Sequence, residues 1–285
     1  MSDVLTQGVL TQNASAGPAT VHLKPILKWA GGKRWLVQQL MDYWQIACAQ
    51  SPRRLVEPFC GGLAVAMGLK PTAACLNDAN PHLINVYRHV QAGLRVTEDF
   101  EHHRAYYNQA RTRFNDLIRS EQAETPLAAQ LFYYLNRTGF NGLCRFNQSG
   151  LFNVPFGRYK TIHYAADFLA YRALFAPWQF TCGDFEALTP QITPSDFIYA
   201  DPPYDVPFVS YAQGGFDWTD QTRLAQWLAG LDVPVVVSNQ ATPRVLALYQ
   251  DLGFRVTTLS APRRIACNGN RLPAQEMLAT LNLPK

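Results

Sequence analysis

Short apolar runs recur along the chain and predict seven buried strands. The predicted strands are residues 55–57, 73–78, 180–184, 197–201, 233–238, 254–259 and 277–281. Segments that read as helices fall between most of these runs, at residues 34–48, 62–69, 82–92, 166–175, 220–230 and 242–251. Alternation of strands and helices is typical of α/β proteins. The pattern therefore predicts a mostly parallel, doubly wound seven-stranded sheet.

A stretch of different character separates the second predicted strand from the third. Residues 99–119 are polar, rich in His and Arg, and predicted to be helical, and Thr125–Pro126 predicts the start of another helix. Residues 136–160 are rich in glycine, asparagine and aromatic side chains and show no periodicity. The predicted organisation is a flexible tail at 1–20, a main domain at 21–94 and 163–285, and an inserted, mainly helical subdomain at 95–162.

Composition narrows the class of protein. With 48% hydrophobic and 16% charged residues, the chain is expected to fold. It has no apolar run near the ~20 residues that span a bilayer. It also has no Lys or Arg before Lys24, which argues against a signal peptide. The six cysteines form no CxxC pair and the six histidines no HExxH motif, so neither a metal site nor a disulfide scaffold is predicted. We expect a cytoplasmic protein with reduced thiols.

The first four predicted strands end at acidic residues, namely Glu57, Asp78, Asp184 and Asp201. In an open α/β sheet, ligands bind beyond the carboxyl ends of the strands, so these acids are expected to line one crevice. In nucleotide-binding sheets an acid at the end of the second strand accepts the ribose hydroxyls. The alternative is that the acids are helix caps or surface groups.

The glycine pattern limits the nucleotide that would fit. A tight turn with Gly61 and Gly62 follows the first strand, but the chain has no Walker loop and no GxGxxG motif. A ligand with an adenosine and no pyrophosphate fits best. Lys33 would meet a carboxylate of this ligand, and Trp29 would cover a sulfonium group. S-adenosylmethionine has all of these features.

Asp201, Pro202, Pro203 and Tyr204 directly follow the apolar segment 197–200. Consecutive prolines end a strand and hold the backbone extended. The Asp201 carboxylate and the Pro202 carbonyl would then accept both hydrogens of an exocyclic amine, directing the nitrogen lone pair of adenine toward a methyl donor. Tyr204 would stack on the base. An ordinary turn after a strand is the alternative.

Several segments together resemble the Dam-type (α-group, D12 class) DNA adenine-N6 methyltransferases, over about residues 27–281. They are LKWAGGK (27–33), VEPFCGG (56–62), GDF (183–185), DPPY (201–204), VVVSNQ (235–240) and RRIACNGNR (263–271). The resemblance implies a Rossmann-like fold. One position departs from the family turn Phe-x-Gly-x-Gly, because Leu63 stands where the second glycine is expected.

The resemblance also implies site residues. The residues expected to be catalytic are Asp201, Pro202 and Tyr204. The residues expected to bind S-adenosylmethionine are Trp29, Lys33, Glu57, Phe59, Gly61, Asp78, Asp184, Phe185 and Asp201. Within this set, Asp184 is expected to meet the amine of the cofactor's adenine, and Phe185 to lie against its ring.

Charge is concentrated in two segments. Residues 136–160 carry four basic side chains and residues 262–272 carry three, with no acidic side chain in either, although the whole chain is only +4. Such polarity suits the backbone of double-stranded DNA. A solvated loop with incidental arginines is the alternative.

A stacked adenine must be flipped out before its amine can react. Phe140 is the predicted wedge that fills the gap, with a role in the subdomain core as the alternative, and Arg145 is predicted to contact a guanine. The resemblance implies the target GATC and base contacts from Lys28, Leu143, Arg145 and Pro155. It also implies that Asn147, Asn153, Arg158 and Tyr159 lie nearer the phosphates. The full set of expected DNA contacts is Lys28, Arg137, Phe140, Asn141, Leu143, Arg145, Asn147, Asn153, Pro155, Arg158, Tyr159, Lys160, Arg263 and Arg264.

Three functions stay open from the sequence. They are adenine-N6 methylation, N4-cytosine methylation by the same kind of site, and DNA binding without catalysis; the intact DPPY segment favours the first. We expect a monomer associated with the nucleoid. The sequence leaves open whether a cognate restriction endonuclease is a partner.

Overall fold

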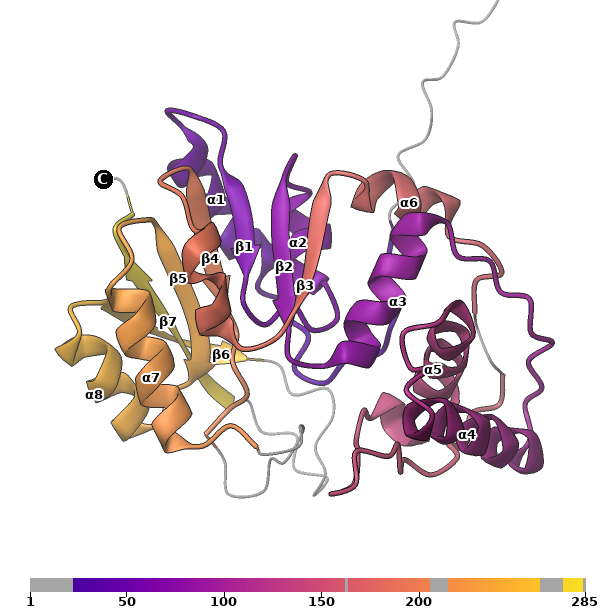
Figure 1. Cartoon of the computed structure of the whole chain (residues 1–285). Helices are drawn as coiled ribbons and strands as arrows, with labels where there is room; N and C mark the ends of the chain where they lie inside the picture. The colour runs from indigo at the N-terminus through magenta and orange to yellow at the C-terminus, as the bar shows by residue number, and fades with distance from the viewer. Residues whose placement is uncertain (1–22, 162–163, 206–214, 262–273, 284–285) are drawn as a thin grey trace, which may run out of the picture.

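The computed structural model describes residues 23–161, 164–205, 215–261 and 274–283 (Figure 1). Its centre is a single sheet with the strand order β3-β2-β1-β4-β5-β7-β6. The strands are β1 (Arg54–Glu57), β2 (Ala74–Asp78), β3 (Trp178–Cys182), β4 (Asp196–Ala200), β5 (Val235–Gln240), β6 (Arg255–Ala261) and β7 (Ala274–Leu281). All seven predicted strands are present, with boundaries shifted by up to three residues.

The sheet is mostly parallel, as predicted. Strands β3, β2, β1, β4 and β5 pair in parallel, and only β7 runs in the opposite direction, between β5 and β6. The strand order reverses on either side of β1, so that β1 and β4 mark the topological switch point of the sheet. The predicted Rossmann-like, doubly wound fold is therefore confirmed.

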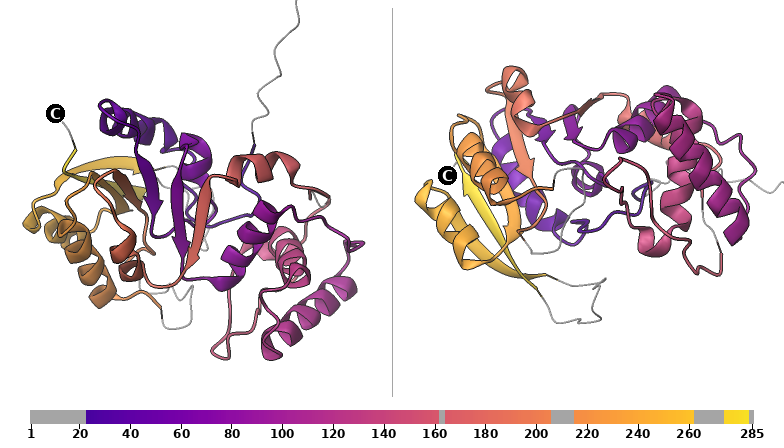
Figure 2. Two further views of the ribbon diagram at one scale, coloured as in Figure 1. Left: turned by 45° about the horizontal axis from the view of Figure 1, so that its top comes forward. Right: turned by 60° about the horizontal axis from the view of Figure 1, so that its bottom comes forward.

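Helices cover both faces of the sheet (Figure 2). They are α1 (Val37–Cys48), α2 (Ala64–Leu69), α3 (Pro81–Ala92), α4 (Arg104–Arg119), α5 (Pro126–Thr138), α6 (Leu169–Phe175), α7 (Trp218–Ala229) and α8 (Pro243–Asp251), with short 3-10 helices η1 (Phe140–Gly142) and η2 (Phe185–Gln191). Helices α3, α5 and α8 each begin with proline after a side-chain cap from Asn80, Thr125 and Thr242. Such starts satisfy the free N–H groups of the first turn.

Successive residues of the central strands point into two separate cores. Leu55 and Phe197 pack with α1 to α6, whereas their neighbours Val56 and Ile198 pack with α7 and α8. This alternation is the side-chain period of a strand. It explains why these strands read as continuous apolar runs, because both faces are buried.

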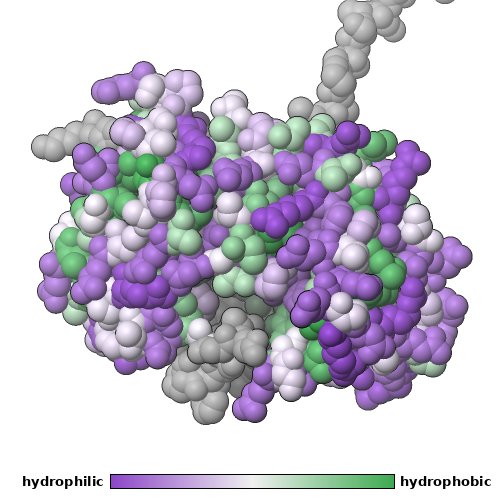
Figure 3. Space-filling view, viewed as in Figure 1, coloured by the Kyte–Doolittle hydropathy of each residue, from purple (hydrophilic) through white to green (hydrophobic). Residues whose placement is uncertain are grey.

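Helices α4 and α5 lie beyond α3, away from α7 and α8 (Figure 1). Their shared interior is aromatic, with Tyr107 and Phe114 of α4 and Phe132 of α5 fully buried. Hydrophilic side chains predominate on the outer side of α4 (Figure 3). The two helices occupy the region predicted as an insert, whose limits at 95 and 162 stay a prediction.

Within the described ranges, no helix is long and apolar enough to cross a membrane. The same residues hold no cluster of three or more His, Cys, Asp or Glu side chains suited to a metal ion.

Candidate active site

The strand order brings the four predicted acids to one edge of the sheet. Glu57 ends β1, Asp78 ends β2, Asp201 directly follows β4, and Asp184 lies two residues beyond β3. These strands are neighbours in the order β3-β2-β1-β4 and run in parallel, so their carboxyl ends meet at the same edge. The helix-cap alternative also holds for Asp184, because its side chain accepts a hydrogen bond from Glu186 N at the start of η2.

Asp78 is held by the turn after β1. Its carboxylate accepts hydrogen bonds from Gly61 N at 3.0 Å and from Asn80 N at 2.9 Å. Burial raises the pKa of Asp78 to about 6, despite these two bonds. The acid at the end of the second strand therefore stands beside the glycine turn, as nucleotide-binding sheets require.

Glu57 is a buried carboxyl group at the base of the same turn, with 2% of its surface exposed. Burial raises its pKa well above the ordinary range, and the charge of Asp201 acts in the same direction. Its Oε1 atom has no hydrogen-bond partner in the described part of the chain. An unpaired buried oxygen is costly, which makes Glu57 a candidate for binding a polar ligand.

Trp29 packs directly on the glycine turn. A Cβ atom at Gly61 would lie 2.7 Å from the indole Nε1 of Trp29, and one at Gly62 would lie 2.8 Å from its Cβ. Only glycine allows this approach. Leu63, at the position that departs from the family turn, adopts φ 60° in the left-handed region that glycine normally fills.

Phe59 and Phe185 lie next to each other beyond the turn, with ring centroids 5.8 Å apart. Asp184 forms an ion pair with Arg223 at 2.8 Å, and the hydrogen bond from Arg223 lowers the pKa of the carboxyl group. The Arg223 guanidinium carbon lies 4.5 Å from the centroid of the Phe185 ring. Arg223 thus contacts both residues predicted for the adenine of the cofactor.

The Asp201 carboxylate is held by two side chains. Lys33 Nζ lies 2.8 Å from its Oδ1 and 2.9 Å from its Oδ2, and Ser238 Oγ donates to Oδ1 at 2.9 Å. The hydroxyl groups of Ser238 and Tyr199 are 2.8 Å apart and buried. Lys33, which is 3% exposed, also lies 3.8 Å from Glu276. The predicted contact of Lys33 with a ligand carboxylate is untested; in this structure its partner is Asp201.

The prolines after Asp201 are fixed as well. Pro202 is buried, and Gln221 Nε2 donates to the Pro203 carbonyl at 2.7 Å while its Oε1 accepts from Asn239 at 2.9 Å. Within the described residues, nothing donates to the Pro202 carbonyl. The Tyr204 ring lies 4.8 Å from Lys33 Nζ, and burial raises the pKa of its hydroxyl far above the usual value.

Lys28 joins the N-terminal segment to α5. The backbone N–H and carbonyl of Lys28 pair with the side chain of Asn136, both at 2.8 Å. Its Nζ donates to the Arg137 carbonyl at 2.8 Å and lies 3.5 Å from the Tyr159 ring centroid. Burial and the charge of Arg137 lower the pKa of Lys28 to about 8. Lys28 and Tyr159, which are both predicted to bind DNA, are therefore in contact with each other.

The loop after α5 exposes the predicted wedge. Phe140 is 47% exposed, so the alternative reading of Phe140 as a core residue is wrong. Its backbone N–H donates to the Pro155 carbonyl at 2.8 Å, which ties the backbone at Phe140 to residues 154–156. Asn141 beside it is exposed and adopts φ 52°.

Arg145 lies at the edge of a small hairpin closed by the bridge between Phe146 and Phe152. Its Nε donates to Asn153 Oδ1 at 2.8 Å. Asn147 accepts hydrogen bonds from Ser149 N and Leu151 N and so shapes the turn of the hairpin. His82 stacks on Phe146, with centroids 4.9 Å apart, and anchors the hairpin to α3.

The remaining predicted DNA residues differ in exposure. Arg158, Lys160 and Pro155 are exposed, whereas Leu143 and Arg137 are half-buried. Arg263 and Arg264 lie outside the described residues. The structure thus brings the predicted residues together in two groups, one at the edge of the sheet and one on the loops after α5.

Several residues of the site were not predicted. Ser238, Gln221 and Asn239 are buried polar residues behind the Asp201 corner, and Asn136 is the partner of Lys28. A signal existed for Ser238 and Asn239, since they interrupt an otherwise apolar run. Arg223 and Gln221, on a helix of mixed composition, gave no such signal.

The acid-lined edge, the glycine turn and the rigid Asp-Pro-Pro-Tyr corner define a Rossmann-like protein of the methyltransferase class. The D12 class N6 adenine-specific DNA methyltransferase family matches residues 29–265. The chain therefore belongs to this family of adenine-specific DNA methyltransferases.

Named relatives agree with this assignment. A DNA N-6-adenine-methyltransferase of Escherichia phage P1 is 33% identical over 96% of this chain, which spans only 38% of the phage protein. A type II methyltransferase of Lactococcus lactis is 34% identical, over 85% of this chain and 89% of the relative. The DNA adenine methylase of Vibrio cholerae is 32% identical, over 90% and 95%.

Similarity to solved structures is more distant. A putative RNA methyltransferase of Pyrococcus horikoshii aligns with a TM-score of 0.39 at 9% identity, covering 86% of this chain and 81% of the other. A SAM-dependent methyltransferase of Agrobacterium tumefaciens aligns with a TM-score of 0.39 at 11% identity, covering 88% and 62%.

Proposed function

We propose that this chain transfers a methyl group from S-adenosylmethionine to N6 of an adenine flipped out of duplex DNA, within the sequence GATC. The observation that carries the proposal is the position of the Asp201 corner. It follows β4, next to β1, whose glycine turn is bonded to Asp78. A nucleoside at the turn and a base at the corner would therefore meet at one edge of the sheet.

The residues at the turn fit S-adenosylmethionine. Asp78 offers an ionisable carboxylate to the ribose hydroxyls, and Trp29 with Gly61 forms a close-fitting wall. The buried Glu57 Oε1 atom has an open acceptor position. Phe59, Phe185 and Asp184 would contact the adenine of the cofactor, and Lys33 would lie near the carboxylate of its methionine part. When bound, this cofactor supplies an activated methyl group on its sulfonium.

The Asp201 corner suits the exocyclic amine of adenine. Its carboxylate is held by Lys33 and Ser238, and the Pro202 carbonyl has no donor among the described residues. These two oxygens would accept both N–H groups, so that the nitrogen lone pair points away from them. Such fixed acceptors act through positioning and electrostatics, without a covalent enzyme intermediate. Tyr204 would stack on the base.

The loops after α5 supply the DNA-binding side of the proposal. Phe140 is a large apolar side chain at the surface, and its backbone N–H donates to the Pro155 carbonyl. It would fill the space left by the flipped adenine. Arg145, oriented by Asn153, would contact a guanine of GATC. We also propose that the enzyme acts as a monomer in the cytoplasm on nucleoid DNA; a partner endonuclease is left to experiment.

Radiolabelled S-adenosylmethionine and plasmid DNA test the proposal. Label in N6-methyladenine, lost when every GATC is replaced by GTTC, is the expected result. Label in N4-methylcytosine would overturn the choice of base. DNA binding without any label would overturn the catalytic role. Labelled adenine outside GATC would overturn the target sequence alone.

A further inference from the structure

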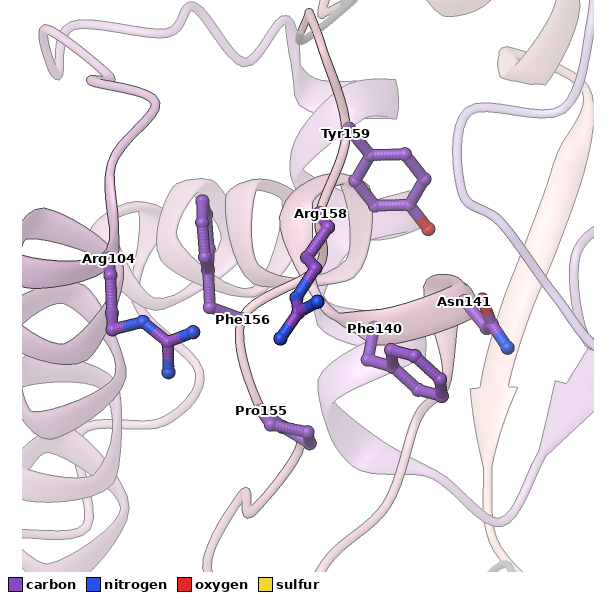
Figure 4. A pocket seen from close by; sticks show the side chains of 7 residues that line it. All are labelled: Arg104, Phe140, Asn141, Pro155, Phe156, Arg158 and Tyr159. Carbon is purple, nitrogen blue, oxygen red and sulfur yellow. The ribbon is translucent and has the colours of Figure 1, made fainter.

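A cavity of about 440 Å³ lies on the side of α4 and the loops after α5, separate from the strand-end acids. Its lining residues are Arg104, Phe140, Asn141, Pro155, Phe156, Arg158 and Tyr159. Figure 4 shows the guanidinium groups of Arg104 and Arg158 reaching toward the same space from opposite sides. Phe156 and Pro155 belong to the same lining. Two of these residues, Arg104 and Phe156, have no role in the proposed function.

The walls of the cavity are tied to one another. Tyr107 of α4 donates to the Val154 carbonyl at 2.8 Å, which fixes the start of α4 against residues 154–159. His102 Nε2 lies 2.5 Å from the Tyr159 carbonyl, and its ring is 5.3 Å from that of Phe156. The other wall is joined by the bridge between Gly139 and Phe156. The segments that carry the two arginines are therefore bonded to each other.

Arg104 differs from the other arginines of α4. Arg111 donates to the Val154 carbonyl, Arg113 pairs with Glu98, and Arg119 pairs with Asp116. Within the described chain, Arg104 and Arg158 form no hydrogen bond or ion pair, and both are exposed. Two guanidinium groups that face one space whose lining contains no acidic side chain favour an anion there.

We infer that this cavity binds a backbone phosphate of the DNA, and that Arg104 and Arg158 bind this phosphate from two sides. The inference rests on the proposed function, since Phe140 and Pro155 on the rim are predicted DNA contacts. The guanidinium groups would bind the phosphate oxygens, and Pro155 and Phe156 would pack against the adjoining sugar. A phosphate contact positions the duplex and carries no sequence information, so Arg104 is a positioning residue for the DNA.

The salt dependence of DNA binding tests Arg104. We expect Arg104→Gln to weaken binding of a GATC duplex and of an unrelated duplex by the same factor, roughly 3- to 10-fold, and to reduce the salt slope by about 0.9. The matched control is Arg119→Gln, which removes the same charge from the last turn of α4. It should bind DNA as the wild type does. Equal behaviour of the two variants would overturn the inference.

Neutral phosphates locate the contact. Each duplex carries one uncharged methylphosphonate in place of one phosphate. At one position, we expect this replacement to weaken binding of the wild type but not to weaken binding of Arg104→Gln any further. Arg104→Lys, which keeps the charge, should restore most of the salt slope. If the loss caused by the methylphosphonate and the loss caused by Arg104→Gln add at every position, Arg104 contacts none of these phosphates and the inference is contradicted. Failure of the proposed function gives a different result, because the wild type would then transfer no methyl group to any duplex.

Discussion

Lys33 Nζ and the Asp201 carboxylate form an ion pair at 2.8 Å, although 168 residues separate them in the sequence. The Lys33 side chain is 3% exposed and that of Asp201 is 20% exposed, so the lysine is shielded from water while the carboxylate stays partly open. Removing Asp201 would leave the buried charge of Lys33 with Glu276, 3.8 Å away, as its remaining acidic neighbour, and would therefore cost stability. The pair therefore fixes the carboxylate and joins the segment before α1 to the end of β4.

The first prediction concerns Asp201. We expect Asp201→Asn to lower the rate of methyl transfer at least about 100-fold, because the amide cannot replace the fixed negative acceptor. Asp205→Asn, four residues further on, is the control, since Asp205 pairs with Arg244 instead. Methylation kinetics and thermal unfolding of both variants check this. Near-normal turnover in a folded Asp201→Asn protein would refute the role of Asp201.

Ser238 holds the Asp201 carboxylate from behind. Ser238→Ala should reduce kcat about tenfold and leave KM for S-adenosylmethionine unchanged, because the carboxylate loses one of its donors while the glycine turn is untouched. Tyr199→Phe should have a smaller effect, since it removes only the bond to Ser238. Steady-state kinetics separates the two constants. A change confined to KM would place Ser238 in cofactor binding instead.

Arg145 is predicted to select the sequence. Arg145→Ala should reduce discrimination between GATC and a site altered at its guanine by about 1–3 kcal/mol. Asn153→Ala should have part of this effect, because Asn153 orients Arg145. Competition methylation with both duplexes measures the ratio. If Arg145→Ala weakens binding to all sequences equally, the side chain contacts phosphate.

Phe140 and Phe132 form a matched pair of one residue type. Phe140→Ala should leave the free energy of unfolding nearly unchanged, because the ring is 47% exposed, and should slow methylation of paired adenine. Phe132→Ala, at 0% exposure, should cost about 3–5 kcal/mol of stability. Denaturant titration and single-turnover kinetics test this. If Phe140→Ala methylates duplexes with a paired and with a mismatched adenine at the same rate, Phe140 is not a wedge.

Asp78 predicts a pH dependence. Its pKa of about 6 lies above the value of 3.8 for a free side chain, so ionisation opposes folding. The stability that protonation of Asp78 contributes is fully present below pH 3.8 and is lost as the pH rises through about 6. Binding of S-adenosylmethionine should show the opposite trend and weaken below about pH 6, as the ribose acceptor is neutralised. Calorimetric titration across this range should show an inflection that Asp78→Asn lacks.

The elements of the fold were predictable because each obeys a local rule. Strands β1, β2, β4 and β5 are apolar on both faces, whereas β3 at the edge of the sheet buries only one face, and α3, α5 and α8 have a cap and a proline at their first turn. Boundaries were less accurate. The third strand was predicted at 180–184 but spans Trp178–Cys182, because Asp184 caps η2 and cannot continue the strand.

The site was predictable where residues are neighbours in sequence, and not where they meet through the fold. The Asp-Pro-Pro-Tyr segment and the glycine turn are continuous. The pairing of Lys33 with Asp201 and of Arg223 with Asp184 depends on the positions of whole strands and helices. Leu63 shows a further limit, since composition alone does not reveal that a leucine adopts a conformation expected of glycine.

The segment from Lys28 to Lys33 connects the residues at the edge of the sheet with those on the loops after α5. At one end Lys28 is bound to Asn136 and Arg137 of α5, and at the other Lys33 is bound to Asp201. Five peptide units span at most about 18 Å when extended. The turn at residues 30–31 shortens this span further, so the loops proposed to bind DNA and the proposed catalytic corner are joined by one short covalent connection that is anchored at both ends.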